Sequence, residues 1–141
     1  MIFKGYVTAR SFNGIYMPVP AQNSCLREFC DQRQGQYVLP HLESSFKNCY
    51  HQLFGAVKES APEDIILMYS IGMLPSGQKL ADLLSLCREK QVAIAFVLEN
   101  IIDSENFSKV FGELDSYRLK ELELPFREWE TLRSRVGFPE E

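Results

Sequence analysis

Apolar and polar residues follow one another along the first hundred positions in blocks that predict strands and helices in turn. Four short apolar runs, Ile2–Ala9, Gln36–Leu39, Ile65–Met68 and Val92–Leu98, have the length and composition of strands buried in a sheet. Each of the first three runs is followed by a stretch with the spacing of an amphipathic helix. The order β-α-β-α-β-α-β implies right-handed crossovers and a mainly parallel sheet.

The boundaries of the helices are predicted from caps and breakers. The first helix begins near Pro20 and stops near Gly35, the second runs from about Ser44 to Ser60, and the third begins after Pro75 with Ser76 as its N-cap. We therefore expect a small three-layer α/β domain over residues 1–124, with four or five strands. A further helix after Asp103-Ser104 and an edge strand at residues 122–124 complete it, and residues 125–141 form a C-terminal helix and acidic tail packed on it.

Charge is distributed unevenly along the 141 residues, although the net charge is only -4. Residues 1–98 carry nine basic and eight acidic side chains, whereas residues 99–141 carry six basic and eleven acidic ones. Because a long phosphate backbone is bound by a basic face, this composition argues against nucleic acid as a partner. No segment approaches the roughly 18–20 apolar residues that span a bilayer. Without a targeting segment we expect a cytoplasmic protein with no membrane partner.

Metal and cofactor motifs are weak throughout the sequence. The four cysteines contain no Cys-x-x-Cys pair, and we interpret them as small, reduced, buried side chains. The two histidines lack an i, i+4 partner, so no metal is expected. The loop from Gly72 to Lys79 resembles a phosphate-binding loop, but Gln78 is interposed and Pro75 removes a backbone donor, which favours a tight turn and a helix cap. We expect no cofactor.

The candidate site lies where the predicted strands end, because ligands of open α/β sheets bind outside the carboxyl ends of the strands. Arg10 and Arg27 are candidates to hold an anionic group, although Arg27 could instead pair with Glu28 or Asp31 at the surface. The candidate proton-transfer and orienting residues are Glu43, His41, Glu99 and Tyr69, and the candidate substrate-binding residues are Arg10, Ser11, Gln22, Asn23, Arg27 and Ser70. The structural alternatives are that Gln22 and Asn23 only cap a helix, that His41 is a loop residue, and that Tyr69-Ser70 only ends a strand.

In outline the layout resembles the catalytic domain of serine recombinases, with Gly5-Tyr6 in an early strand and Gln22 opening the first helix. That family carries a Tyr-x-Arg-x-Ser pattern, whereas here Arg10 and Ser11 are adjacent and come too late. The segment Asp-Arg-Leu-x-Arg expected after the third strand is replaced by residues 69–75, which contain no arginine, and no basic DNA-binding tail follows. The resemblance therefore implies a flavodoxin- or resolvase-like fold without recombinase activity.

A second resemblance, over roughly residues 3–100, is to the sporadic carbohydrate cluster proteins of bacterial surface-polysaccharide gene neighbourhoods. The residues that carry it are Gly5-Tyr6 with Arg10, Gln22-Asn23 with Arg27 and Cys30, then Glu43, Tyr69-Ser70 with Leu74-Pro75, and Glu99. This resemblance implies an enzyme of surface-polysaccharide or nucleotide-sugar biosynthesis.

Two hypotheses about function follow. The first is an enzyme that binds a small anionic sugar-like molecule, with Glu43 and His41 in acid-base roles and Glu99 and Tyr69 orienting hydroxyl groups. The second is a non-catalytic, recombinase-like module for dimerisation or regulation, which contacts its partner or a second copy through residues 103–138, with Phe126 and Trp129 as anchors.

Overall fold

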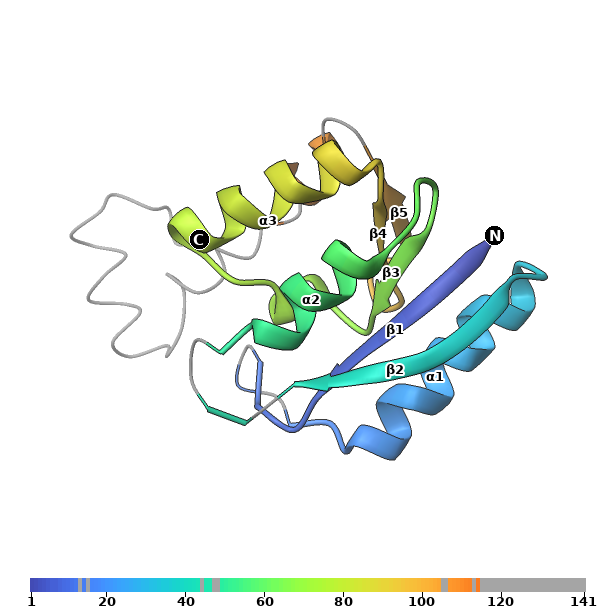
Figure 1. Ribbon diagram of the computed structural model, residues 1–141. Helices are drawn as coiled ribbons and strands as arrows, with labels where there is room; N and C mark the ends of the chain where they lie inside the picture. The colour runs from blue at the N-terminus through green and yellow to red at the C-terminus, as the bar shows by residue number, and fades with distance from the viewer. Residues whose placement is uncertain are drawn as a thin grey trace, which may run out of the picture. The chain divides into compact units, whose positions relative to one another are not determined.

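The computed structural model of the protein describes residues 1–12, 14, 16–43, 45–46, 49–104, 107–112 and 114 (Figure 1). The chain divides into two compact units, Met1–Phe107 and Ser108–Glu141. In the second unit, residues 108–112 are helical, in agreement with the helix predicted after Asp103-Ser104. The predicted edge strand at 122–124, the boundary at 124 and the C-terminal helix and tail lie outside the described residues.

A five-stranded sheet in the order β2-β1-β3-β4-β5 forms the centre of the first unit (Figure 1). The strands β1 (Ile2–Thr8), β2 (Gln36–Glu43), β3 (Ile65–Met68) and β4 (Ala93–Phe96) are parallel, which confirms the predicted α/β class and the mainly parallel sheet. The fifth strand, β5 (Ile101–Asp103), is antiparallel to β4. The sequence analysis missed this edge strand because it has only three residues and follows a tight turn that ends at Asn100, whose φ is 56°.

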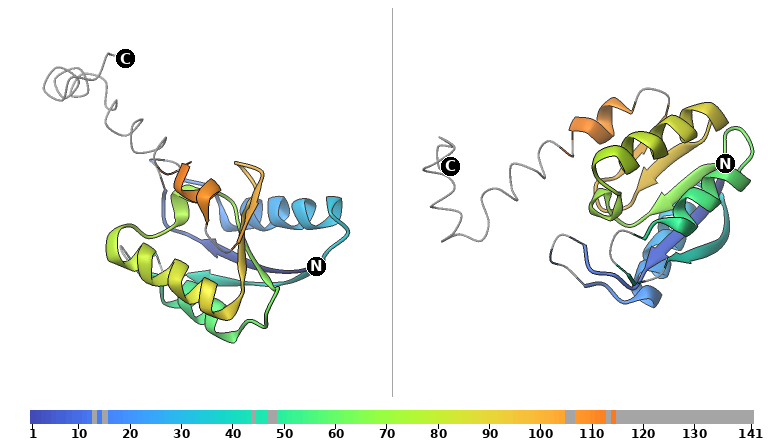
Figure 2. Two further views of the ribbon diagram at one scale, coloured as in Figure 1. Left: turned by 90° about the horizontal axis from the view of Figure 1, so that it is seen from above. Right: turned by 60° about the vertical axis from the view of Figure 1, so that its left-hand side comes forward.

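Helices cover both faces of the sheet and make three layers (Figures 1 and 2). Helix α1 (Val19–Gln32) lies on one face, and α2 (His51–Glu59) and α3 (Gly77–Lys90) lie on the other. A short 3₁₀ helix, η1 (Ile71–Met73), follows β3. Among the described residues, no helix combines the length and the hydropathy that a bilayer crossing requires.

The core is divided between the two faces of the sheet by the alternation of side chains along each strand. On the α1 face, Phe3 and Val7 of β1 pack with Leu26, Phe29 and Cys30. The rings of Phe3 and Phe29 meet edge to face with centroids 6.0 Å apart. The side chains that alternate with these along the strands, such as Tyr6 in β1 and Phe96 in β4, are fully buried. They point to the face of the sheet that α2 and α3 cover. Both faces are therefore sealed from water.

Strand β2 differs from its prediction, because it continues through Pro40 to Glu43 instead of ending at Leu39. Its pairing with β1 shifts by one residue, since Lys4 pairs with Val38 but Tyr6 pairs with His41. This irregularity is a β-bulge, and a bulge on an edge strand is where proline is tolerated. The extra residue turns the side chains after Pro40 to the opposite face of the sheet.

Candidate functional site

Glu43, the last residue of β2, caps the first turn of α2. Its carboxylate accepts hydrogen bonds from the backbone N–H groups of Gln52 at 3.1 Å and Leu53 at 3.2 Å, and from the Tyr6 hydroxyl at 2.9 Å. The Cys49 thiol adds a weaker contact at 3.5 Å. Burial, and then the nearby Glu43 charge, raise the pKa of Tyr6 well above its usual value. The carboxylate is 2 % exposed and fully engaged, and this cap explains why α2 begins at His51 rather than at Ser44.

Arg10, just beyond β1, ties the segment before α2 to the end of the sheet. Its Nη1 donates to the carbonyl oxygens of Phe46 at 3.1 Å and Cys49 at 2.8 Å. The guanidinium lies 4.5 Å from the centroid of the Tyr50 ring, and the Lys79 ammonium lies 5.7 Å from the same centroid. Nη2 is buried without a hydrogen-bond partner. The geometry of Arg10 is therefore that of a cross-link between two loops.

Gln22 in α1 also acts as a cross-link, between the end of β1 and the loop that follows it. Its side chain is completely buried, and Nε2 donates to the carbonyl oxygens of Thr8 and Met17, each at 2.8 Å. Its Oε1 accepts from the Thr8 N–H at 3.3 Å, and the Thr8 hydroxyl accepts from the Arg10 N–H at 3.1 Å. These bonds satisfy backbone groups that have no strand partner at the end of β1.

Glu99 and Ser70 form a third cap, at the ends of β3 and β4. The Ser70 hydroxyl donates to Glu99 Oε2 at 3.0 Å and accepts from the Gly72 N–H at 3.0 Å. Glu99 Oε1 accepts from the Ile71 N–H at 3.1 Å, so this carboxylate holds the start of η1. The ring of Tyr69 packs against that of Phe12 at 6.1 Å between centroids.

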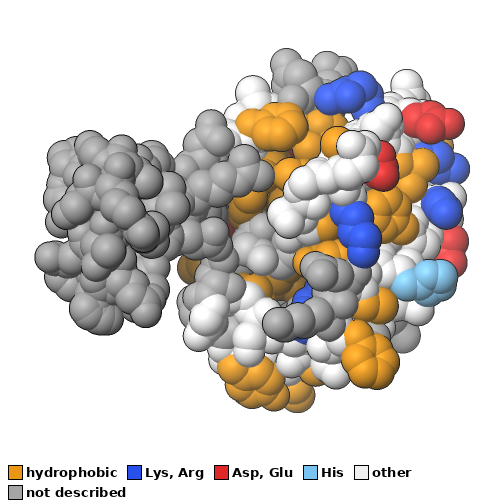
Figure 3. All heavy atoms as spheres, turned by 90° about the vertical axis from the view of Figure 1, so that its left-hand side faces the viewer, with side chains coloured by type: hydrophobic (Ala, Val, Ile, Leu, Met, Phe, Trp, Pro, Cys, Tyr) orange, Lys and Arg blue, Asp and Glu red, His pale blue; other side chains and the backbone are white. Residues whose placement is uncertain are grey.

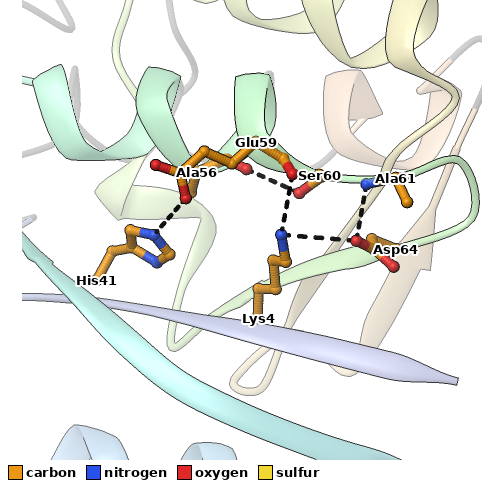
Figure 4. A network of polar contacts seen from close by, with 7 residues as sticks. All are labelled: Lys4, His41, Ala56, Glu59, Ser60, Ala61 and Asp64. Carbon is orange, nitrogen blue, oxygen red and sulfur yellow. Dashed lines mark hydrogen bonds and ion pairs between the residues drawn. The ribbon is translucent and has the colours of Figure 1, made fainter.

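The remaining candidates lie apart from these caps. His41 faces the last turn of α2, where Nε2 lies 3.5 Å from Glu59 Oε1 and Nδ1 is buried without a partner (Figure 4). On the α1 side, Asn23 accepts from the Tyr37 hydroxyl at 2.7 Å, and the Arg27 guanidinium lies 5.0 Å from the Tyr37 ring centroid. Burial raises the pKa of Tyr37 to about 12. Ser11 is exposed to solvent. The structure thus brings the candidates into several separate groups.

The face toward which β1 and β2 run shows hydrophobic side chains in separate groups, with lysine and arginine side chains lying singly among them (Figure 3). Three large side chains of the loops and strand end in this region are exposed: Tyr16 by 64 %, Leu42 by 57 % and Phe46 by 76 %. No group of three or more metal-ligating side chains occurs in the described part of the chain.

Two cavities lie elsewhere and involve none of the ten candidates. One of about 620 Å³ adjoins the starts of β3 and β4, and one of about 360 Å³ lies between α1 and the turn after β4. Neither cavity is predicted from the sequence, because the residues that line each one come from segments distant in the chain. The lining of the larger cavity includes one charged side chain of each sign, Glu63 and Arg88, and these come from different elements.

Comparison with solved structures identifies the fold. No protein-family model matches the chain, and no curated protein matches its sequence. The N-terminal catalytic domain of TP901-1 integrase superposes with a TM-score of 0.53 at 17% identity, covering 87% of this chain and 99% of that one. A resolvase family site-specific recombinase from Streptococcus pneumoniae gives a TM-score of 0.55 at 11% identity, covering 96% and 99%. The chain has a resolvase-like fold.

This finding confirms the recombinase-like outline and corrects the functional expectation. The hypothesis of a carbohydrate-biosynthesis enzyme is wrong, because both similar structures are site-specific recombination proteins and the sporadic carbohydrate cluster family finds no match. The expected sugar-like partner and the exclusion of nucleic acid are wrong for the same reason, because the similar structures are those of an integrase and a site-specific recombinase. Five of the predicted site residues make contacts within the fold: Arg10, Gln22, Glu43, Ser70 and Glu99.

Proposed function

We propose that the chain is a non-catalytic, resolvase-fold module that takes part in DNA recombination by associating with a second copy of itself. One observation carries this proposal. Where the serine recombinase pattern Tyr-x-Arg-x-Ser has its arginine and its serine, counted from Tyr6, this chain has Thr8 and Arg10. Both residues are engaged by the fold, Thr8 with Gln22 and the Arg10 N–H, and Arg10 with the carbonyl groups before α2.

The segment after β3 supports the same conclusion. Aligned on Leu74, the pattern Asp-Arg-Leu-x-Arg becomes Gly72-Met73-Leu74-Pro75-Ser76, so neither arginine is present. Met73 and Leu74 are buried at 2 % and 7 % exposure and continue the core. Transfer of a phosphodiester to a hydroxyl group requires an activated nucleophile and cations around the phosphate. Among the described strand-end residues, the cation at Arg10 is committed to two carbonyl oxygens and both carboxylates are committed to helix starts.

The partner surface that we propose is residues 103–138, with Phe126 and Trp129 as aromatic anchors. Large aromatic side chains carry a disproportionate share of binding energy in protein interfaces. This segment carries eight of the nineteen acidic residues and six of the fifteen basic ones. Phe126 and Trp129 themselves lie outside the described residues.

The catalytic half of the proposal is tested by incubating the chain with supercoiled plasmid DNA and looking for nicked product and for a covalent protein–DNA adduct. The expected result is neither product, in the wild type and in Ser11→Ala alike. The choice of Ser11 matters, because its exposed hydroxyl is the nearest serine to the family position. An adduct formed by the wild type and absent from Ser11→Ala would overturn the non-catalytic assignment.

The association half is tested by light scattering across a concentration series. We expect self-association of the wild type and weaker self-association of Trp129→Ala, with Tyr16→Ala as a matched control because Tyr16 is an exposed aromatic residue outside 103–138. A wild type that stays monomeric at every concentration, or a Trp129→Ala variant that associates as strongly as the wild type, contradicts the proposed surface.

A further inference from the structure

The outer edge of β2 is a border of the sheet, since the strand order is β2-β1-β3-β4-β5 (Figure 1). In the described part of the chain, no strand pairs with this edge. The buried core that α1 covers is built on β1, β3 and β4, and β2 adds the partly buried Tyr37. Helix α1 therefore packs over the inner strands of the sheet rather than along the edge of β2.

The pairing with β1 identifies the backbone groups of β2 that face outward. The Gln36 N–H donates to the Met1 carbonyl oxygen at 2.8 Å, and Val38 is paired in the same ladder. Because successive residues of a strand direct their N–H and C=O groups to opposite sides, Gln36 and Val38 face β1, whereas Tyr37 and Leu39 face away from the sheet. Hydrogen-bond donors and acceptors of the backbone therefore line the first half of this edge.

This half of the edge lacks the features by which proteins prevent edge strands from pairing. Lysine side chains, inward-pointing charges, prolines, bulges and very short strands are the usual ones. Residues 36–39 contain no charged side chain and no proline. Pro40 and the β-bulge come immediately afterwards, so they set the point where pairing ends without interrupting the groups before it. The opposite border of the sheet is different, because β5 has only three residues.

The outward groups require an extended strand as the partner, because a strand offers donors and acceptors at the matching spacing. A second β2 that runs antiparallel and is centred on Val38 provides this match, since Tyr37 of each copy then exchanges both hydrogen bonds with Leu39 of the other. Val38 meets its own counterpart across the axis, and such contacts between β-branched side chains stabilise pairing. Neither strand brings a charge into residues 36–39, so two copies meet without repulsion.

The size of this contact determines which strand occupies it. Pairing of half a strand buries much less than the roughly 1,200 Å² of a stable interface, so a free peptide or an unrelated chain would not stay bound. A second copy that already associates through residues 103–138 is held at a high effective concentration, at which a weak contact is occupied. The small area therefore favours a second copy of this chain over other partners.

We propose that β2 pairs antiparallel with β2 of a second copy, about a twofold axis at Val38, and joins the two sheets into one continuous sheet. The inference rests on the self-association in the proposed function and adds to it a contact between the Met1–Phe107 units of the two copies. Because the same residues contribute from both sides, the contact is isologous and closes a dimer.

Amide hydrogen exchange of the wild type, followed by nuclear magnetic resonance across a concentration series, tests the register. Exchange at Tyr37 and Leu39 should slow as the concentration rises, by about twofold when half of the chains are paired, because only the unpaired half exchanges. Gln36 and Val38, whose N–H groups face β1, are the internal controls and should change less. If light scattering shows association but exchange at Tyr37 and Leu39 does not depend on concentration, the inference is overturned and the proposed function stands.

Oxidative cross-linking tests the position of the axis. Val38→Cys places two thiols on residues whose Cα atoms lie about 4.5 Å apart in the pairing, within the reach of a disulfide. Gln36→Cys is the matched control, because its two Cα atoms are about 14 Å apart across the same axis, too far for a disulfide. With copper phenanthroline as the oxidant, we expect a disulfide-linked dimer from Val38→Cys in excess of that from Gln36→Cys. The wild type measures any cross-linking by the native cysteines, which all three proteins share.

The outcomes separate this inference from the proposed function. Equal cross-linking of Val38→Cys and Gln36→Cys overturns the pairing of β2. A wild type that is monomeric by light scattering, together with excess cross-linking of Val38→Cys, contradicts the surface at 103–138 and supports the pairing of β2. A monomeric wild type without excess cross-linking overturns both.

Discussion

At the scale of single residues, Glu43 shows how much a buried carboxylate does in this fold. It joins Tyr6 of β1 to two of the free N–H groups in the first turn of α2. Glu43→Gln removes the charge that these donors share and supplies an NH₂ group where only acceptors fit. We expect a loss of about 1–3 kcal/mol in the free energy of unfolding, as for other buried charged hydrogen-bond acceptors.

Urea unfolding followed by circular dichroism measures this loss. The control is Glu89→Gln, which removes the same charge from an exposed position on α3 and should leave the midpoint unchanged. Equal midpoints for wild type and Glu43→Gln would show that the cap contributes nothing.

Replacing two of the glycines by alanine should change the free energy of unfolding in opposite directions. A Cβ at Gly5 would lie 2.5 Å from the Tyr37 hydroxyl oxygen and 3.1 Å from Pro40 Cβ, and that hydroxyl is fixed by its bond to Asn23. Gly5→Ala should therefore cost about 1–3 kcal/mol, as other overpacked core positions do. Gly55 lies inside α2 with nothing within 4 Å of its added Cβ, so Gly55→Ala should add about 0.5–1 kcal/mol. Denaturant melts of the two variants check both signs, and a stabilised Gly5→Ala would contradict the close approach of β1 and β2.

The polar residues of the strand ends were found from the sequence, but their partners were not. The apolar run before Tyr69-Ser70 marks the end of β3 correctly, because buried strands are apolar and their ends meet water or helix termini. Whether such a side chain then turns outward to a ligand or inward to a helix N-terminus depends on loop paths that no local pattern encodes. Here Glu43, Glu99 and Gln22 all turn inward.

At the scale of elements, both ends of β1 and β3 and the starts of α1 and α3 were predicted to within one or two residues. The strands are short apolar runs, and each of the two helices begins next to a proline. The errors occur where a long-range contact sets the boundary. Strand β2 passes through Pro40 because a bulge accommodates it, and α2 starts late because Glu43 caps it. Strand β5 exists only through its pairing with β4.

The β-bulge at Pro40 leads to a prediction about the cooperativity of unfolding. Deleting Pro40 removes the extra residue of the bulge. If the part of β2 before the bulge keeps its pairing with β1, the side chains of His41 and Glu43 then point away from α2. We expect this deletion to lose the sharp unfolding transition, whereas Pro40→Ala, which keeps the residue count, should retain it. Near-ultraviolet circular dichroism and thermal melts distinguish the two, and a deletion variant with wild-type cooperativity would show that β2 tolerates a slip of register.

At the scale of the whole molecule, the hydrophobic pattern predicted the fold correctly, whereas the net charge led to a wrong prediction about the partner. The alternation of strands and helices led to a resolvase-like sheet, which the solved structures confirm. The net charge of -4 led to the exclusion of nucleic acid, which was wrong, because charge summed over a chain says little about a partner bound by one segment or through a second subunit. Fold class follows from periodicity, whereas the partner depends on the surface.

The buried titratable groups predict how the stability of the whole unit depends on pH. Burial raises the pKa of Cys30 and Tyr6, and raises the pKa of Tyr37 and Cys87 to about 12 each. Above about pH 9 the unfolded chain loses these protons while the folded chain keeps them, so the unfolded state binds fewer protons and stability falls as pH rises. Each such group steepens the fall by about 1.4 kcal/mol per pH unit between its two pKa values.

Urea unfolding between pH 8 and pH 12 measures this slope, and Tyr37→Phe isolates one contribution to it. Between pH 10 and 12 the variant should lose stability less steeply than the wild type, by about 1.4 kcal/mol per pH unit, because one titrating group is gone. Tyr16→Phe, at a position that is 64 % exposed, is the matched control. The sign is decisive, because a stability that rises with pH in this window requires folded-state pKa values below those of the unfolded chain, whereas burial raises the pKa of Tyr37 by more than the nearby Arg27 charge lowers it.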